Sequence, residues 1–180
     1  MEATEIDEFR KTVQEGKEAR LTHVSLAISI LAVLVAMVTV MGHRTHTEAV
    51  LLQSRAADQW NEYQAKKIRQ TEYAVAADLL SLQPSSNGAA VERKLAEYKA
   101  RNTKADTDLK EEQDKARELE AEVGKAEHAA GRYDLGEALL EIAVVLSSIT
   151  LLTRQKMFFA GGLVLGATGA AIALTGLLAK

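Results

Sequence analysis

The sequence predicts an all-α integral membrane protein: three transmembrane helices, with a long antiparallel helical hairpin (a coiled-coil stalk) between the first and second. Two observations predict this class. The 180 residues hold their apolar side chains in three blocks instead of spreading them along the chain. A long stretch dense in Lys, Arg, Asp and Glu separates the first block from the second. A soluble domain distributes its apolar residues more evenly, so the blocks indicate membrane spans.

The first apolar block covers residues 21–42 and follows a polar N-terminal lead, residues 1–20. The block carries no charge when His23 is neutral. About 20 helical residues cross about 30 Å of hydrocarbon, so the block is long enough to be transmembrane helix 1. It is longer than the apolar region of a signal peptide, many acidic residues precede it, and it lacks a small-x-small cleavage site at its end. We therefore expect an uncleaved anchor.

Residues 43–134 are expected to form an extramembrane helical hairpin with its turn at residues 83–89. The first arm, up to Leu82, contains neither Pro nor Gly from Thr45 on and is rich in good helix formers. The only proline, Pro84, lies in QPSSNG, a combination typical of a helix end and a turn. Apolar residues of the second arm recur at alternating steps of three and four, which predicts a stripe packed against a partner helix. The stripe comprises Val91, Leu95, Tyr98, Ala105, Leu109, Ala116, Leu119, Val123, Ala126, Ala130 and Tyr133, interrupted by Asn102 and Glu112.

The first arm has a poorer stripe. Its early apolar residues drift out of phase with its late ones, which indicates packing against a second subunit as well as against the second arm. The early set is Leu52, Ala56, Trp60 and Tyr63, and the late set is Val75, Leu79 and Leu82.

Two further apolar blocks close the chain, transmembrane helix 2 at residues 135–152 and transmembrane helix 3 at residues 157–179. The short basic loop between them, residues 153–156, contributes Arg154 and Lys156. Because positive residues favour the cytoplasmic side, we expect this loop and the N-terminus in the cytoplasm and the stalk outside.

Small residues recur at steps of three and four in two of the predicted spans. In lipid, little hydrophobic force acts between helices, and small side chains let two backbones approach closely. The stripes therefore predict packing interfaces, either within the chain or between copies. They comprise Ser25, Ser29, Ala32 and Ala36 in the first span, and Gly162, Gly166, Gly169, Ala173 and Gly176 in the third.

Four ionisable residues near the ends of the first and second spans form the candidate site. His43 and His46 continue the stripe of the first span, and Glu137 and Glu141 lie one helical turn apart at the start of the second. We favour a hydrogen-bonded polar collar that joins stalk to membrane. Two alternatives stay open. Imidazole and carboxylate together suit a divalent metal ion such as Zn, Fe or Mn. A carboxylate inside a span, as at Glu141, is also typical of an ion or proton path.

Several classes of function find no support in the sequence. Without cysteine, disulfides, thiolate catalysis and thiolate metal sites are excluded. Residues 42–134 contain 15 basic and 17 acidic residues, a balance that argues against nucleic-acid binding. No nucleophile constellation, phosphate-binding loop or nucleotide motif is present, so we expect neither an enzyme nor a cofactor.

Two strings, GHRTHTEA and DQWNEYQAK, carry a resemblance to a known family. With the first span, they resemble a bacterial membrane-protein family catalogued as a domain of unknown function, number four-three-three-seven. The likeness covers nearly the whole chain: anchor, His-rich exit, Trp-containing helix, charged middle helix and closing membrane hairpin. It implies a multi-pass protein of the bacterial inner (plasma) membrane with no assigned activity. It transfers no functional residues.

Two functions from different classes are expected. The first is a membrane-anchored, oligomeric helical scaffold or interaction protein, whose partners are the lipid bilayer, further copies of the chain and possible proteins bound to the stalk. The second is a small ion or proton transporter, channel or ion-responsive sensor that uses Glu141 with His43 and His46. An oligomer is expected in both cases. For the transporter or channel, the reason is that three spans form a path only when copies assemble.

Overall fold

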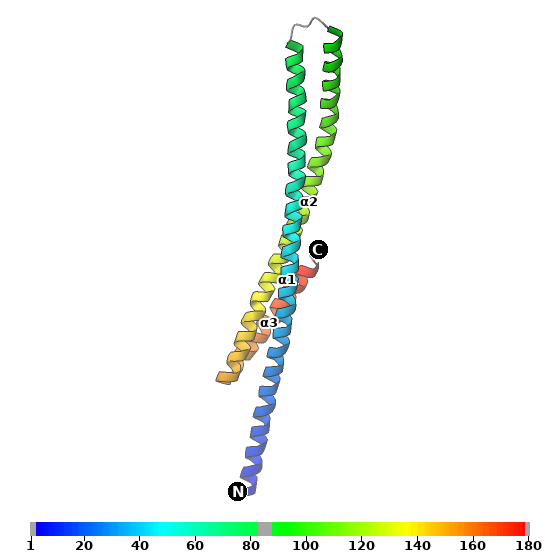
Figure 1. The fold of residues 1–180 in the computed structure, drawn as a ribbon. Coiled ribbons are helices and arrows are strands. Elements are labelled where there is room, and N and C mark those ends of the chain that lie inside the picture. The colour runs from blue at the N-terminus through cyan, green and yellow to red at the C-terminus, as the bar shows by residue number, and fades with distance from the viewer. Residues whose placement is uncertain (1–2, 83–87, 179–180) are drawn as a thin grey trace. The chain divides into compact units, whose positions relative to one another are not determined.

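In the computed structural model, the described residues form three α-helices and no strand (Figure 1). The description covers the backbone of residues 3–82 and 88–178, and the side chains from residue 22 onward within those ranges. Helix α1 spans Ala3–Leu82, α2 spans Gly88–Thr153 and α3 spans Lys156–Leu178. The predicted all-helical fold is confirmed, and each helix contains a segment long and apolar enough to cross a membrane.

Helices α1 and α2 each continue through more than one predicted segment. Helix α1 runs without a break through the lead from Ala3 on, the first apolar block and the first arm. Helix α2 does the same for the second arm and the second apolar block. No proline interrupts either range, so nothing in the backbone forces a helix end at these junctions. Most of the predicted turn, residues 83–87, lies outside the described residues, and α2 begins at Gly88.

The contacts divide the chain into two compact units. The first, here called the three-helix unit, contains the chain up to Thr47 and from Lys125 onward. The second, here called the hairpin unit, contains Glu48–Gly124. Helices α1 and α2 contribute to both units, whereas α3 belongs to the three-helix unit alone.

The hairpin unit is an antiparallel pair of helices. Gln70 of α1 donates a hydrogen bond to Asp106 of α2 at 2.5 Å, and the rings of Tyr73 and Tyr98 stack with centroids 6.1 Å apart. Residue numbers rise along α1 as their partners' numbers fall along α2, which defines antiparallel packing. The stripe predicted on α2 forms its side of the seam, and all of its members are buried or half-buried.

The α1 side of this seam repeats every seven residues, with polar side chains among its members. Gln59, Lys66 and Gln70 all lie on it, which is why a search for apolar residues alone finds two sets out of phase. The seam comprises Ala49, Leu52, Ala56, Gln59, Tyr63, Lys66, Gln70, Tyr73, Ala77 and Leu80, all buried or half-buried.

In the three-helix unit, α2 and α3 approach each other through glycine. All five small residues predicted on the third span are buried in α3. A β-carbon added to Gly169 would lie 2.8 Å from the carbonyl oxygen of Gly136, and one added to Gly136 would lie 2.8 Å from that of Gly169. Since real β-carbons essentially never come so close to another atom, both positions are restricted to glycine at this helix spacing.

Helix α1 packs on this pair with large side chains, not with its small ones. Leu31 is 6% exposed and forms a core with Leu140 and Ala143. A β-carbon on Gly166 would lie 2.7 Å from Leu31 Cδ2, so the missing side chain of the glycine makes the space that the leucine fills. The predicted stripe of Ser25, Ser29, Ala32 and Ala36 is exposed within the single chain. Its predicted packing role therefore concerns a surface that this chain does not cover.

The connection between α2 and α3 is very short. Arg154 and Gln155 alone lie between the two helices. Arg154 has a φ angle of 57°, and its N–H donates to the carbonyl oxygen of Thr150 at 2.8 Å. This bond ends α2 with a residue in the left-handed conformation, a position that glycine usually occupies.

Candidate functional site

Polar side chains connect all three helices near the ends of their apolar segments. His46 Nε2 of α1 lies 3.0 Å from both carboxylate oxygens of Asp134 of α2. Further into the apolar segments, by two helical turns along α1 and one along α2, Thr39 Oγ1 donates to Glu137 Oε1 at 2.5 Å. The same hydroxyl lies 2.9 Å from the carbonyl oxygen of Val35, and its single proton serves one acceptor at a time.

Arg132 makes the corresponding connection between α2 and α3. Its Nη1 donates to Thr175 Oγ1 of α3 at 2.7 Å. Its Nε and Nη2 lie 3.3 and 3.2 Å from Nε2 of His128, one turn earlier on α2. Together with the two α1–α2 contacts, this arginine completes a set of polar links that holds α2 to both of its neighbours.

The four residues predicted for the site are not brought together. His46 and Glu137 form hydrogen bonds, but with Asp134 and Thr39 and not with each other. His43 and Glu141 are exposed, and their side chains form no hydrogen bond or ion pair with the part of the chain that the structure describes. Within that same part, no three His, Asp or Glu side chains are placed to share a metal ion. The polar collar remains a prediction, with a different set of contacts from the one expected.

Four of the linking residues were not predicted from the sequence: Thr39, Arg132, Asp134 and Thr175. Depth and residue type alone do not show which helix faces meet. Asp134 is the last residue before the apolar block. That position is the sequence feature that could have identified it as a site residue. His46 contacts Asp134, whereas the His43 side chain, 60° away around the helix, does not.

Glu141 lies on an exposed apolar surface of α2. Its neighbours Ile142 and Val145 are 49% and 57% exposed, and Glu141 itself is exposed. An ionised carboxylate surrounded by hydrocarbon is costly, so such a residue is protonated, paired or in contact with water. Nothing in the described part of the chain pairs it.

The hairpin unit contains a buried ion pair. Glu112 is 7% exposed, and Lys66 Nζ donates to its Oε1 at 2.6 Å. Gln59 donates to the other carboxylate oxygen. The hydrogen bond from Lys66 holds the pKa of Glu112 below its usual value, and the same bond raises the pKa of Lys66. A charge buried with two good partners fixes the register of two helices, because any slip leaves it unpaired.

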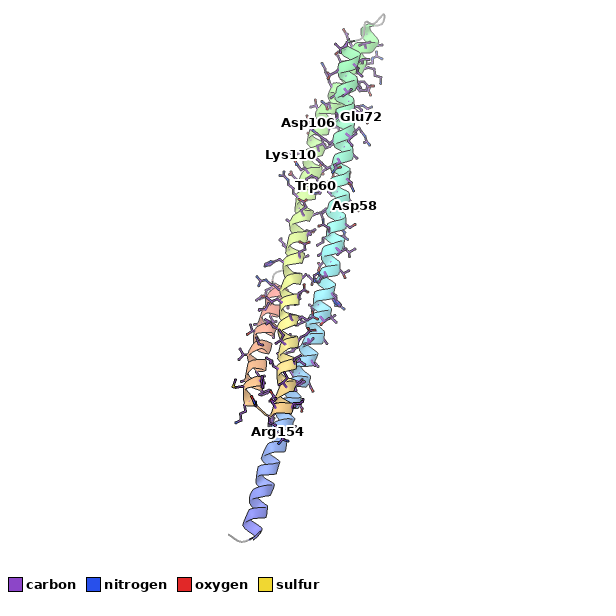
Figure 2. All side chains as sticks on the ribbon, turned by 90° about the vertical axis from the view of Figure 1, so that its left-hand side faces the viewer. Asp58, Trp60, Glu72, Asp106, Lys110 and Arg154 are labelled. Carbon is purple, nitrogen blue, oxygen red and sulfur yellow. The ribbon has the colours of Figure 1, made fainter. Side chains whose placement is uncertain are left out.

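Charged side chains cover both arms of the hairpin unit outside this seam. Asp58 and Glu72 of α1, and Asp106 and Lys110 of α2, are among those labelled in Figure 2. Against this background, one surface of α1 is apolar. Ile68, Val75, Leu79 and Leu82, here called the outer stripe, are 61%, 51%, 60% and 79% exposed.

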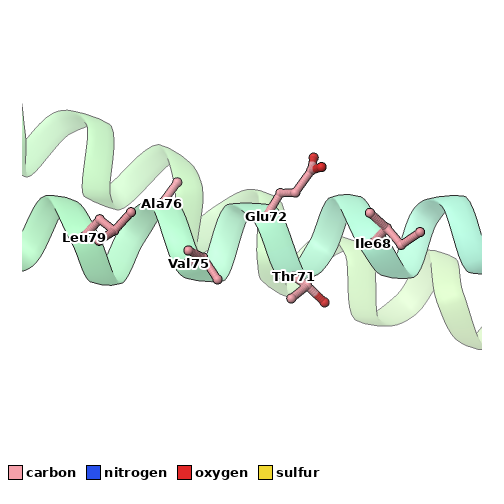
Figure 3. Close-up of a pocket in the computed structure, with 6 residues that line it drawn as sticks. All are labelled: Ile68, Thr71, Glu72, Val75, Ala76 and Leu79. Atoms are coloured by element: carbon pink, nitrogen blue, oxygen red, sulfur yellow. The ribbon is translucent and has the colours of Figure 1, made fainter.

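The outer stripe faces away from the seam. Ile68, Val75 and Leu82 follow one another at steps of seven, and each lies two residues before or five after a seam position such as Gln70 or Ala77. At 100° per residue, this places them on the opposite side of α1. A shallow groove of about 420 Å³ is lined by three residues of this stripe together with Thr71, Glu72 and Ala76. In Figure 3, the side chains of Glu72 and Thr71 point to opposite sides of α1. Among the described residues of α2 in the hairpin unit, no large apolar side chain is exposed to this degree.

Comparison with known proteins places the chain in a family. The family described as "Domain of unknown function (DUF4337)" matches residues 20–179. The chain belongs to this family. The matched range includes the apolar segments, the polar links, the buried ion pair and the outer stripe, so all of these are parts of the DUF4337 domain. No curated protein and no solved structure matches the chain.

Proposed function

We propose that this DUF4337 protein is a membrane-anchored, oligomeric helical scaffold, with a binding and not a catalytic role. The observation that carries the proposal is the outer stripe. Four large apolar side chains lie exposed on one face of the hairpin, at steps of seven, four and three residues, the spacing of a helix–helix seam. A partner helix with the same seven-residue repeat would cover such a surface. The opposite face of α1 already packs against α2, so the outer stripe is the face available to a partner.

The energetics favour a partner for this stripe. Covering the exposed part of a Leu, Ile or Val side chain contributes about 1 to 2 kcal/mol, so four of them contribute enough to hold a weak complex. Anchoring in a membrane raises the effective concentration of copies that carry the stripe at the same height. The partner that best fits these conditions is a second copy, with the outer stripes of two α1 helices side by side.

The proposed setting is the bacterial inner membrane. The apolar segments of the three helices are long enough to cross it. In the proposed orientation, the N-terminus and the connection at residues 153–156 lie in the cytoplasm and the hairpin lies outside. The positive charges of Arg154 and Lys156 support this orientation. A cysteine introduced at exposed Gln53 should then react with a membrane-impermeant thiol reagent in intact cells, whereas one at Gln155 should not.

The oligomer is tested on the outer stripe itself. Replacing Val75→Glu and Leu79→Glu together adds two charges to the stripe, and we expect the full chain in detergent to shift to smaller species by light scattering. The matched control is Gln53→Glu with Ser81→Glu, which adds the same charge to exposed polar positions of the same helix outside the register of the outer stripe. A monomeric unmodified protein, or equal shifts in both variants, would contradict the proposal.

A second function is supported by one observation, the exposed carboxylate of Glu141 in an apolar segment. In an ion or proton transporter or channel, copies would enclose this carboxylate together with the His43–His46 region. The variant Glu141→Gln should then abolish a proton flux in liposomes, while Glu127→Gln, an exposed position of α2 outside the apolar segment, should leave it unchanged. Absence of flux in the unmodified protein rejects this second function.

A further inference from the structure

Arg132 lies at the level where apolar segments of two helices end. It precedes the apolar block at residues 135–152 by one helical turn. Its partner Thr175 lies one turn before the end of α3 at Leu178. The hydrogen bond of 2.7 Å between them therefore marks a single depth, at the boundary between apolar and polar side chains. In the proposed membrane setting, this is the depth of the lipid phosphates.

The charge of Arg132 has no counter-ion in the part of the chain that the structure describes. Its three contacts go to a hydroxyl and an imidazole, both uncharged when they accept. Asp134, two residues on, is engaged with His46, and Glu137 accepts from Thr39. A half-buried guanidinium normally finds a carboxylate or phosphate, because its planar group of donors matches their oxygens.

Arg132 also has hydrogen-bond donors to spare. A guanidinium carries five N–H groups. One serves Thr175, and Nε and Nη2 share the single lone pair of His128 Nε2. At least two donors remain for an anion, and Thr175 and His128 hold the group in place for it.

A second basic residue lies on the same face of α2. Lys125, His128 and Arg132 are three and four residues apart, which aligns them along the helix. Lys125 and His128 are exposed. The carboxylates within five residues of Arg132 all point more than a third of a turn away from it at 100° per residue: Glu127, Asp134 and Glu137. The face is therefore locally positive in a protein whose net charge is −3.

Exposed leucines continue this face toward the apolar side. Leu135 follows Arg132 by three residues and is 54% exposed. On α3, Leu174 directly precedes Thr175 and is 62% exposed. A ligand whose phosphate binds Arg132 thus meets apolar surface directly below it, which suits an acyl chain and not a free phosphate ion.

We propose that Arg132, with Lys125, His128 and Thr175, forms a binding site for the phosphate of an anionic phospholipid. The guanidinium donates to the phosphate oxygens, Lys125 adds charge, and the acyl chains lie along Leu135 and Leu174. Basic groups between membrane helices at this depth bind lipid headgroups by the same chemistry. The inference rests on the proposed membrane insertion but not on the proposed oligomer.

The test uses the full chain in detergent micelles, titrated with phosphatidylglycerol or phosphatidylcholine, with bound lipid counted by native mass spectrometry. We expect phosphatidylglycerol to bind about tenfold more tightly, since hydrogen bonds to charged groups are among the stronger ones. Arg132→Gln should remove this preference. Arg117→Gln, which removes the same charge from an exposed position of the hairpin unit, should keep it.

Two further variants keep the test decisive if Arg132→Gln does not fold. Arg132→Lys retains the charge but not the forked donors, and Thr175→Val removes the hydroxyl that positions them. Each should weaken the preference by a smaller factor than tenfold. A wild-type protein that binds the two lipids equally overturns the proposal. Displacement of phosphatidylglycerol by millimolar inorganic phosphate also overturns it, since the site would then be one for free anions.

Failure of the inference can be told apart from failure of membrane insertion. Flotation of the protein with phosphatidylcholine vesicles on a density gradient measures insertion without any anionic lipid. Protein that floats but shows no preference for phosphatidylglycerol overturns the lipid site alone. Protein that stays at the bottom of the gradient overturns both.

Discussion

The two helix pairs of this protein are held together in opposite ways. In the three-helix unit, α2 and α3 meet where side chains are missing, at Gly136, Gly162 and Gly169. In the hairpin unit, α1 and α2 meet through long polar side chains, with Glu112 buried between them and bonded to half-buried Lys66. The difference follows the proposed surroundings. In lipid, tight helix packing depends on close approach of the two backbones. In water, the burial of apolar side chains already holds two helices together, and a buried ion pair fixes their register.

The largest loss of stability is expected from a substitution at Gly162. A β-carbon there would lie 2.5 Å from Ser147 Oγ and 2.9 Å from the carbonyl oxygen of Ala143, and the second contact is with backbone. We expect Gly162→Ala to lower the free energy of unfolding by about 2 to 3 kcal/mol, as overpacking does. The measurement is a detergent titration of helix content by circular dichroism.

The adjacent glycine is the control. A β-carbon on Gly161 would find its nearest neighbour, Leu146 Cδ1, at 4.0 Å, which is ordinary contact. Gly161→Ala should therefore be neutral, or stabilising by up to about 1 kcal/mol, because alanine favours the helix. Equal losses in the two variants would show that the α2–α3 spacing is not set by glycine.

A somewhat smaller effect is expected at the buried ion pair. Lys66→Met keeps the length of the side chain but leaves the Glu112 carboxylate with a hydrogen bond from Gln59 and with Lys115 Nζ at 3.8 Å. We expect a loss of about 2 kcal/mol, less than for a fully buried pair because Lys66 is partly exposed. Trp60 is the only tryptophan of the chain and lies in the hairpin unit, where its Nε1 donates to Glu120 at 2.8 Å. Its fluorescence in a urea titration reports on this unit.

Removing both charges sharpens this test. The pair Lys66→Met and Glu112→Leu replaces the ion pair by apolar side chains. It should recover most of the stability lost in Lys66→Met alone, because no buried charge is left unpaired. A double variant as unstable as Lys66→Met alone would mean that the ion pair also contributes to the free energy of unfolding, beyond fixing the register.

The smallest effect is the pH dependence of the same unit. The hydrogen bond from Lys66 lowers the pKa of Glu112 in the folded state below its usual 4.5. The unfolded chain therefore takes up the proton first as pH falls, and the associated stability is present above pH 4.5 and lost below it. The urea midpoint from Trp60 fluorescence should fall between pH 5 and pH 3 by more in the unmodified protein than in Lys66→Met. Equal falls would place the acid sensitivity in other carboxylates.

The sequence predicts the features that repeat at a regular spacing. It does not predict those that depend on which way a side chain points from its helix. The glycines of α3 and the stripe of α2 repeat at steps of three and four, and both are buried where expected. Gln59 and Gln70 lie on the α1 seam although they are polar, so a search for apolar residues could not find it.

The candidate site was predicted less well than the fold. Depth along two helices placed Glu141 near His43 and His46, but depth does not say which way a side chain points. The bulk of Leu31 also decided which face of α1 packs on α3, and it lies beside, not on, the predicted small-residue stripe. Contacts between side chains of different helices, such as Arg132 with Thr175, need the three-dimensional arrangement.

The left-handed residue between α2 and α3 has a consequence for how the chain is made. At Arg154, where φ is 57°, glycine would avoid a backbone cost of about 1 kcal/mol. An arginine at this place keeps a permanent positive charge at the tip of the closing helical pair, and such a charge resists transfer across a membrane during synthesis. In the proposed orientation, the strained residue thus retains the connection on the cytoplasmic side while the two helices insert as a pair.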